Sequence, residues 1–359
     1  GRAVSTRAPV TVQGDLTVEV PAASLNGQFR ESRCHASRHA LQPKSPGSAE
    51  PPVQACAAAL EPPTAADNAS DYARLERSLR KAHGLDLAGS ELAALQSLPH
   101  AVRQGGWTVQ VLVEGGRVLR VQPGKSPRIA VAFDIGTTSI WAQAIDMSTG
   151  AVLAEASAYN PQIACGDDVI SRIVFSQKQG GLGRLQRLAL DGCAGLLDEL
   201  YRKSGLSKES VTHVTAAGNT VMAHLLLGIE PKYLRESPYV PAITIVPPLR
   251  AAAAGFDLAP WVPLYLLPCV ASYVGGDIVA GVAACGMHAS EEITLYMDLG
   301  TNGEIVLGNQ DWLMTASCSA GPAFEGGGLA CGMRAMPGAV EGFSLGSDRA
   351  PMVLTIGSA

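Results

Sequence analysis

The sequence predicts an α/β protein with duplicated subdomains, preceded by a small α+β domain. A buried strand that ends in Asp-x-Gly-Thr occurs twice, near residues 134 and 298, and a second strand follows each copy. Strand-like segments alternate with amphipathic helical segments between the two copies. The 359 residues suffice for two or three domains, and 47% of them are hydrophobic, so packed cores can form.

Composition excludes several classes of function. The formal net charge is -5 and no basic block is present, which argues against a nucleic-acid partner. No signal peptide is recognisable, and no apolar run reaches the roughly 20 residues of a membrane span. The 8 cysteines include no C-x-x-C pair and match no zinc or iron–sulfur spacing. We therefore expect reduced, mostly buried thiols in a cytoplasmic protein, and no iron–sulfur cluster on this chain.

The N-terminal part, residues 1–69, is predicted to be a linker region. Residues 42–69 are rich in Pro, Ala and Ser, a composition typical of linkers. Within the region, residues 15–20 alternate like a short strand. Both ends of the chain suggest a piece of a longer protein, because it begins without Met and stops just after an apparent strand.

Residues 70–124 are predicted to form the small α+β domain. Ser70 or Asp71 can cap a first helix that stops at Gly84, and Ser90 can cap a second one. Two strand-like segments then flank Glu114-Gly-Gly, which is a hairpin signal.

Two further units are predicted, at 129–290 and 291–359, the second of them incomplete at its C-terminal end. The first opens with a continuous apolar strand at 129–133, and a strong amphipathic helix spans 183–203. The remaining expected elements of the first unit are strands at 140–145, 152–157 and 211–216 and helices at 219–227 and 278–287. The second unit repeats the opening pattern with strands at 293–297, 304–307 and 312–316.

The repeated loops suit the phosphates of a nucleotide. Glycine at a hairpin tip lets backbone N–H groups approach phosphate oxygens, and Thr and Asn add donors without bulk. The aspartates that end the strands, Asp134 and Asp298, can hold Mg²⁺ through water and so act in catalysis. The expected phosphate contacts are Gly136, Thr137, Thr138, Gly300, Thr301 and Asn302. The alternative is a plain hairpin turn, which a matching second copy makes less favourable.

Other candidates keep two interpretations each. Glu304 can orient water as a general base or occupy a surface strand position. Gly218 and Asn219 precede a helix, where they can bind phosphate or simply cap it. Gly275, Gly276 and Asp277 can line the cleft, or Asp277 can be an N-cap. Gly321 belongs to a Gly-rich loop expected over the nucleotide, flanked by Cys318 and Cys331, which we expect to be core residues.

Two motifs are rejected and one cluster stays open. Pro123–Ser126 resembles the end of a Walker A loop, but Leu119 stands where that loop needs Gly. Gly181-Leu-Gly183 begins a dinucleotide fingerprint without its third Gly or a clear preceding strand. The cluster of Asp167, Asp168 and Arg172 can form a partner or cleft surface, or a solvated helix start.

The duplicated loop resembles the actin, sugar-kinase and Hsp70 superfamily, whose two RNase H-like subdomains clamp ATP and Mg²⁺. Several longer strings make the chain similar to one family in it, the reductive activators of corrinoid (B12-dependent) proteins, over residues 71–359. The strings are Asn160-Pro-Gln162, Gly166–Arg172, Ala217–Met222, Gly275–Asp277 and Ala320–Gly338.

The resemblance implies a function in repair. Family members return inactive Co(II) to Co(I) on a corrinoid protein, a methyl carrier or methyltransferase, and ATP drives the conformational change that this requires. It also implies a separate electron donor and a [2Fe–2S] ferredoxin domain expected to precede this chain. No B12-binding D-x-H-x-x-G motif occurs, so cobalamin should arrive on the partner, and His224 is expected to be a core residue. A homodimer is one oligomeric state that the sequence leaves open.

Three alternatives remain at this level. One is a small-molecule kinase of the same fold, although no substrate-binding insertion stands out. The second is an activator of 2-hydroxyacyl-CoA dehydratases with a [4Fe–4S] cluster at a subunit interface, which the scattered cysteines disfavour. The third is a non-catalytic nucleotide sensor or scaffold.

Overall fold

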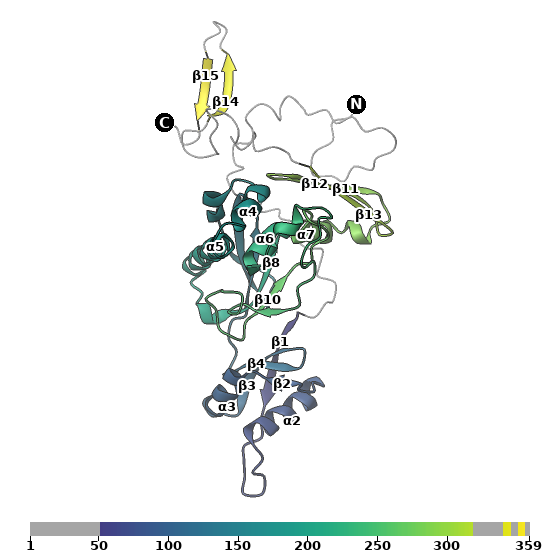
Figure 1. Ribbon diagram of the computed structural model, residues 1–359. Helices are drawn as coiled ribbons and strands as arrows, with labels where there is room; N and C mark the ends of the chain where they lie inside the picture. Colours follow the sequence, from purple (N-terminus) through teal and green to yellow (C-terminus); the bar gives the residue numbers. More distant parts are fainter. Residues whose placement is uncertain (1–50, 319–339, 346–350, 356–359) are drawn as a thin grey trace.

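The computed structural model describes residues 51–318, 340–345 and 351–355. Figure 1 shows the domain that contains residues 53–123 at one end, a large sheet with helices in the middle, and a three-stranded sheet beyond it. None of the helices in these described ranges has the length and apolar character needed to cross a lipid bilayer.

The small domain is a four-stranded sheet, in the order β1-β3-β4-β2, with two helices. Its strands are β1 (Val53–Ala59), β2 (Gly89–Ser90), β3 (Thr108–Glu114) and β4 (Arg117–Pro123), and its helices are α2 (Asp71–His83) and α3 (Leu92–Gln104). The hairpin of β3 and β4 confirms the turn predicted at Glu114-Gly-Gly. Residues 53–59, which fall in the predicted linker region, form the strand β1, which pairs antiparallel with β3. Alanine-rich composition concealed the strand, whose small side chains fit beneath α2.

The caps of the two helices differ in how well the sequence predicts them. Ser70 accepts a hydrogen bond from the Ala73 amide, and Gly84 ends α2 in the left-handed conformation with φ 65°, as expected. The predicted cap of α3 is wrong, because Ser90 belongs to β2, which pairs in parallel with β4. Glu91 takes the N-cap position without a side-chain cap bond.

The central sheet has six strands in the order β7-β6-β5-β8-β10-β9. Its strands are β5 (Ile129–Ile135), β6 (Ser139–Asp146), β7 (Val152–Tyr159), β8 (Val211–Gly218), β9 (Leu249–Arg250) and β10 (Pro263–Leu266). Strand β5 runs antiparallel to β6 and parallel to β8. The helices are α4 (Val169–Ser176), α5 (Gly181–Ser204), α6 (Thr220–Leu227) and α7 (Gly276–Cys285). The predicted strands and helices of this region are confirmed to within a few residues.

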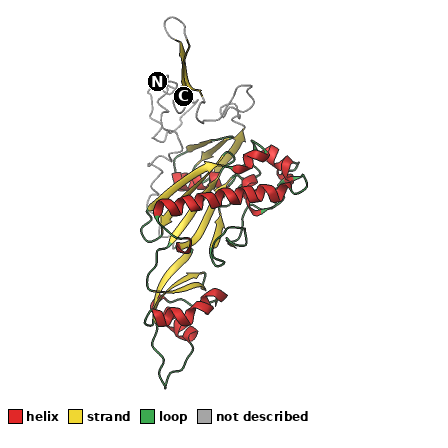
Figure 2. Ribbon diagram, turned by 90° about the vertical axis from the view of Figure 1, so that its left-hand side faces the viewer, coloured by secondary structure: helices red, strands yellow, loops and turns green. Residues whose placement is uncertain are grey.

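The long helix α5 crosses one face of this sheet (Figure 2) and contacts β6 and β7. Its apolar side is buried along most of its length, as the predicted amphipathic pattern requires, and Leu182, Leu188 and Leu190 are half-buried. The buried side chains include Leu185, Leu196 and Leu200. This packing holds β6, the strand that follows the first Asp-x-Gly-Thr loop.

A second, antiparallel sheet carries the second loop. It consists of β11 (Thr294–Leu299), β12 (Gly303–Gly308) and β13 (Leu313–Cys318), in the order β11-β12-β13. Strand order and direction repeat those of β5, β6 and β7. Val306 packs toward α7 with Val274, Ile278 and Met287. Strands β14 (Val340–Leu345) and β15 (Pro351–Thr355) form a separate antiparallel pair.

An ion-paired joint fastens the small domain to the central sheet. Arg250 on β9 places one guanidinium nitrogen 2.8 Å from the Glu91 carboxylate and another 2.8 Å from that of Glu114. The Tyr265 hydroxyl donates a further hydrogen bond to Glu114. All of these side chains are partly shielded from water, so the pairs are screened less than surface pairs.

Candidate functional site

The two repeated loops face each other across a cavity of about 270 Å³. The loop between β5 and β6 forms one wall, and the loop between β11 and β12 forms the other. The N-terminal ends of α6 and α7 complete it through Asn219 and Asp277. The lining residues are Asp134, Gly136, Thr137, Thr138, Ser139, Trp141, Asn219, Asp277, Asp298, Gly300, Thr301, Asn302 and Glu304. The structure thus brings together most of the residues predicted from the sequence.

The loops touch directly. The hydroxyl oxygens of Thr138 and Thr301 lie 2.8 Å apart, so one donates a hydrogen bond to the other. The two copies of the motif therefore meet at the cavity that they both line.

The two loops differ by one residue, which the sequence repeat does not reveal. Asp134 pairs across its hairpin with Trp141, whereas Asp298 pairs with Glu304. The first hairpin therefore has one more residue than the second before the return strand begins. As a result, Trp141 and Glu304 occupy equivalent places beside the two aspartates.

Four acidic side chains share this cavity, and each has a raised pKa. Desolvation, followed by repulsion from Asp277 and Asp298, raises the pKa of Asp134 to about 6. Desolvation and the charge of Asp298 raise the pKa of Asp277 to about 6. Burial also raises the pKa of Asp298. The cavity therefore concentrates negative charge that a cation would neutralise.

Glu304 is a cavity residue rather than a surface residue of its strand. Its side chain is only 7% exposed, so the surface interpretation is wrong. The Ser317 hydroxyl donates a hydrogen bond of 3.2 Å to Oε1. Desolvation, with the charges of Asp277 and Asp298 adding to it, raises the pKa of Glu304 to about 7. A carboxyl group with this pKa can exchange protons near neutral pH.

Within the described ranges, no group of three or more His, Cys, Asp or Glu side chains lies close enough to hold a metal ion directly. Asp134 and Asp298 are near enough for their charges to interact. Mg²⁺ keeps several of its waters in proteins, so a pair of carboxylates that contacts it through water fits the residues present.

Asn219 caps α6, as one of its two interpretations predicts, and it also lines the cavity, whereas the neighbouring glycines do not. The Asn219 side chain caps α6 by accepting from the Val221 amide at 2.9 Å. A Cβ atom on Gly275 would lie 2.2 Å from the Gly218 carbonyl oxygen, so these two backbones are in close contact. Gly275, not Asp277, is the N-cap of α7, and Gly276 packs against Leu267 in a similar way. The glycines therefore position Asn219 and Asp277.

Arg172 corrects another expectation. It was a candidate for an exposed cluster with two aspartates, but its side chain is completely buried. Its guanidinium donates to the Thr137 carbonyl oxygen, in the first loop, at 2.5 Å. Asp168 caps α4 in a capping box with Ser171, which confirms the helix-start interpretation for that residue. In the sequence, Gly166–Arg172 stands out only as a family-like string, and nothing local indicates that Arg172 is buried.

The other candidates lie away from the cavity. His224 is buried, contacts the Thr220 carbonyl at 2.7 Å and accepts from the Ala242 amide, which confirms a core residue. Cys318 is exposed, so its assignment to the core is wrong: it ends β13, at the end of the described segment. Gly321 and Cys331 lie outside the described residues.

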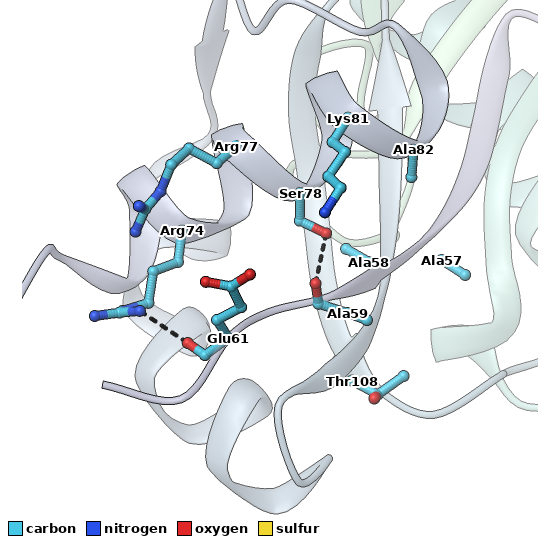
Figure 3. Close-up of a pocket in the computed structure, with 10 residues that line it drawn as sticks. All are labelled: Ala57, Ala58, Ala59, Glu61, Arg74, Arg77, Ser78, Lys81, Ala82 and Thr108. Atoms are coloured by element: carbon cyan, nitrogen blue, oxygen red, sulfur yellow. Dashed lines mark hydrogen bonds between the residues drawn. The ribbon is translucent and has the colours of Figure 1, made fainter. Parts of the chain in front are cut away.

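A second hollow, of about 610 Å³, lies between β1 and α2 and contains no predicted site residue (Figure 3). Arg74, 2% exposed, forms part of its wall and donates to backbone carbonyls of Glu61, Asp67 and Ala69. Ser78 on the same helix donates to the Ala59 carbonyl at 2.8 Å. These contacts attach α2 to the edge of the sheet.

Three family models, all for regions of RACo, together match almost the whole described chain. Residues 43–127 match the RACo linker region, residues 129–290 match the RACo middle region, and residues 292–359 match the C-terminal domain of RACo, described as the ASKHA domain.

Individual relatives agree with this assignment. The chain is 33% identical over 242 residues to the corrinoid activation enzyme RamQ of Eubacterium limosum, covering 66% of this chain and 40% of RamQ. It is 26% identical over 230 residues to a Methanosarcina barkeri protein described as [Co(II) methylated amine-specific corrinoid protein] reductase, covering 58% and 39%. A solved reductive activator for corrinoid, iron–sulfur protein matches with 39% identity and a TM-score of 0.75, covering 86% of this chain and 50% of that one.

The chain spans half or less of the length of each of these relatives. The matched regions nevertheless include both repeated loops and the small domain. The fold is accordingly of the RNase H-like, actin-like ATPase type, as the sequence predicts. This chain belongs to the RACo family of reductive activators of corrinoid proteins.

Proposed function

We propose that this chain is the nucleotide-binding part of an enzyme that uses ATP to return an inactive Co(II) corrinoid protein to Co(I). The observation that carries the proposal is the contact between Thr138 and Thr301, which sets two phosphate-type loops face to face. The names of the relatives support the corrinoid protein as the partner. The acidic cavity supports a nucleotide that arrives with a cation.

In this proposal the phosphates of ATP lie between the loops Asp134–Thr138 and Asp298–Asn302. Asp134 and Asp298 hold Mg²⁺ through water, and the ion neutralises charge on the phosphates. Glu304 is the candidate general base, because its raised pKa lets it accept a proton from water near neutral pH. Asn219 and Asp277 complete the wall at the ends of two helices.

In this proposal, ATP binding shifts the protein toward one of two conformations. One electron reduces Co(II) to Co(I), and hydrolysis of ATP to ADP and phosphate accompanies the change of shape that makes this transfer possible. A ligand shifts such an equilibrium only by its difference in affinity for the two conformations. A cavity between two lobes provides that difference, because closing the lobes changes the contacts of the phosphates from both sides.

The remaining components belong to the whole protein and its surroundings. We propose that the electron comes from a separate donor and passes to the cobalt through a [2Fe–2S] domain outside this chain. We assign the protein to a reducing, cytoplasmic setting, as the cysteine pattern of the sequence leads us to expect. A homodimer remains part of the proposal to be measured by mass in solution.

The test uses the full-length protein with a corrinoid protein held as Co(II) and a reductant. Affinity for the corrinoid protein is measured with and without Mg–ATP, and the loss of Co(II) is followed by absorbance. We expect ATP to change both. By linkage, the corrinoid protein must change the affinity for ATP by the same factor.

Two results would redirect the proposal. Equal affinity in both nucleotide states, together with Co(II) reduction that ignores ATP, would refute an activator. Phosphate transfer to a small alcohol would then favour a kinase, and ATP binding without turnover would favour a sensor.

A further inference from the structure

The backbone of the first loop is held from behind by side chains that belong to neither copy of the repeat. The Asn160 side-chain amide donates to the Gly136 carbonyl oxygen at 2.8 Å. The Arg172 guanidinium donates to the Thr137 carbonyl oxygen at 2.5 Å. The backbone amide of Asn160 donates to the Thr138 carbonyl oxygen at 2.8 Å. Three successive carbonyl groups are therefore bonded to the segment of residues 160–172.

This arrangement determines where the N–H groups of the loop point. In a trans peptide unit the C=O and the N–H lie in one plane and point in opposite directions. The carbonyl groups of Gly136, Thr137 and Thr138 point toward the segment of residues 160–172. The N–H groups of the same peptide units therefore point in the opposite direction. Those N–H groups belong to Thr137, Thr138 and Ser139, which all line the cavity. Successive N–H groups that converge on one space form a binding site for anionic oxygens.

The two supporting side chains are themselves fixed. Asn160 and Arg172 are both 0% exposed. Arg172 also donates to the Gly166 carbonyl at 2.9 Å and to Gln162 Oε1 at 3.1 Å. Gln162 is oriented in turn by its hydrogen bond of 2.9 Å to the Leu185 carbonyl on α5. The planar guanidinium thus ties the loop to α4 and α5, which a lysine, with its single ammonium, cannot do in the same way.

We propose that Arg172, with Asn160, is a positioning residue that holds the first loop as a preformed phosphate site and so sets the affinity for the nucleotide. The inference rests on the proposed function, because it takes the phosphates of ATP as the ligand. The role is one of positioning: neither side chain lines the cavity, and both act through the loop backbone.

The test compares Arg172→Lys with Arg74→Lys in the full-length protein. Arg74 is a matched control, because it is also buried and donates to three backbone carbonyls, but in the small domain. We expect Arg172→Lys to raise KM for ATP about tenfold or more, while kcat falls much less, since binding before and during the reaction is weakened alike. Arg74→Lys should leave both constants within about twofold while lowering thermal stability.

A second measurement does not depend on turnover. Hydrogen exchange without nucleotide should be several-fold faster at residues 136–139 in Arg172→Lys than in the unaltered protein, while the amides of α5 remain unchanged. If the unaltered protein binds no Mg–ATP, the proposed function fails, and this exchange still decides whether Arg172 holds the loop. Unchanged loop exchange, or a KM for ATP equal to that of Arg74→Lys, would overturn the inference.

Discussion

Thr138 and Thr301 join the two copies of the repeated loop through a hydrogen bond of 2.8 Å between their hydroxyl groups. The bond closes one edge of a cavity whose walls carry four carboxyl groups. The two loops are therefore in direct contact at this edge of the cavity.

Replacing both threonines should be less damaging than the sum of the single replacements. Thr138→Val and Thr301→Val each remove the same hydrogen bond, so the double variant loses little more than either single variant. We expect each to lower the free energy of unfolding of the nucleotide-free protein by about 0.5–1.5 kcal/mol, the scale of one hydrogen bond. The measurement is urea unfolding of the unaltered protein, the two single variants and the double variant. Thr108→Val, in the small domain, is the control, and strictly additive losses would argue against the contact.

The aspartates at the ends of β5 and β11 should be needed for turnover. Asp134→Asn and Asp298→Asn keep the shape of the side chain but remove its charge, so the predicted magnesium contact is lost. ATP hydrolysis by the full-length protein should fall by about a hundredfold in each case. Asp146→Asn, at the other end of β6, lies outside the cavity and should have no effect on turnover. Full activity in both cavity variants would place the nucleotide elsewhere.

Glu304 should make stability depend on pH. Its pKa is raised from 4.5 to about 7, so the folded protein holds a proton there that the unfolded chain has released. The contribution of Glu304 to stability is present below pH about 4.5 and is lost as pH rises through about 7. Glu304→Gln should therefore raise Tm at pH 8 and leave it nearly unchanged at pH 4.5.

The measurement is thermal unfolding of the nucleotide-free protein across this range. Glu292→Gln, on an exposed residue, is the control. A difference in Tm between Glu304→Gln and the unaltered protein that does not vary with pH would show that the carboxyl group is not desolvated.

Gly275 should not tolerate a side chain. A Cβ atom there would lie 2.2 Å from the Gly218 carbonyl oxygen and 2.5 Å from Asn219 Cα, and both are backbone atoms. Gly275→Ala should lower the free energy of unfolding by about 1–3 kcal/mol, the usual scale of overpacking. Gly195→Ala is the matched control, because its Cβ meets nothing within 4 Å on α5.

The control should be stabilised by about 0.5–1 kcal/mol, since alanine restricts the unfolded chain and suits a helix. Urea unfolding followed by circular dichroism measures the free energy of unfolding of both variants. An equal change in that free energy in Gly275→Ala and Gly195→Ala would mean that the ends of β8 and α7 are free to separate.

The sequence by itself determined the elements whose evidence is local. These elements are the apolar strand β5, the amphipathic helix α5, and the helix caps Ser70 and Gly84. Each depends on residues that lie close together in the sequence. The repeated Asp-x-Gly-Thr motif predicted both walls of the cavity, because strand, glycine tip and polar donors are consecutive in the chain. Family-like strings predicted the membership that the comparisons show.

Tertiary structure decided what depends on distant partners. Strand β1 exists because β3 pairs with it and α2 covers it, and its alanine-rich segment carries no strong strand signal. Burial of Arg172 and Glu304 follows from the packing of other elements around them, as does the one-residue difference between the hairpins. From sequence alone, a charged residue is predicted to lie at the surface, because burying its charge is costly unless other groups compensate for it. Those groups are distant in the sequence, and only the folded chain brings them together.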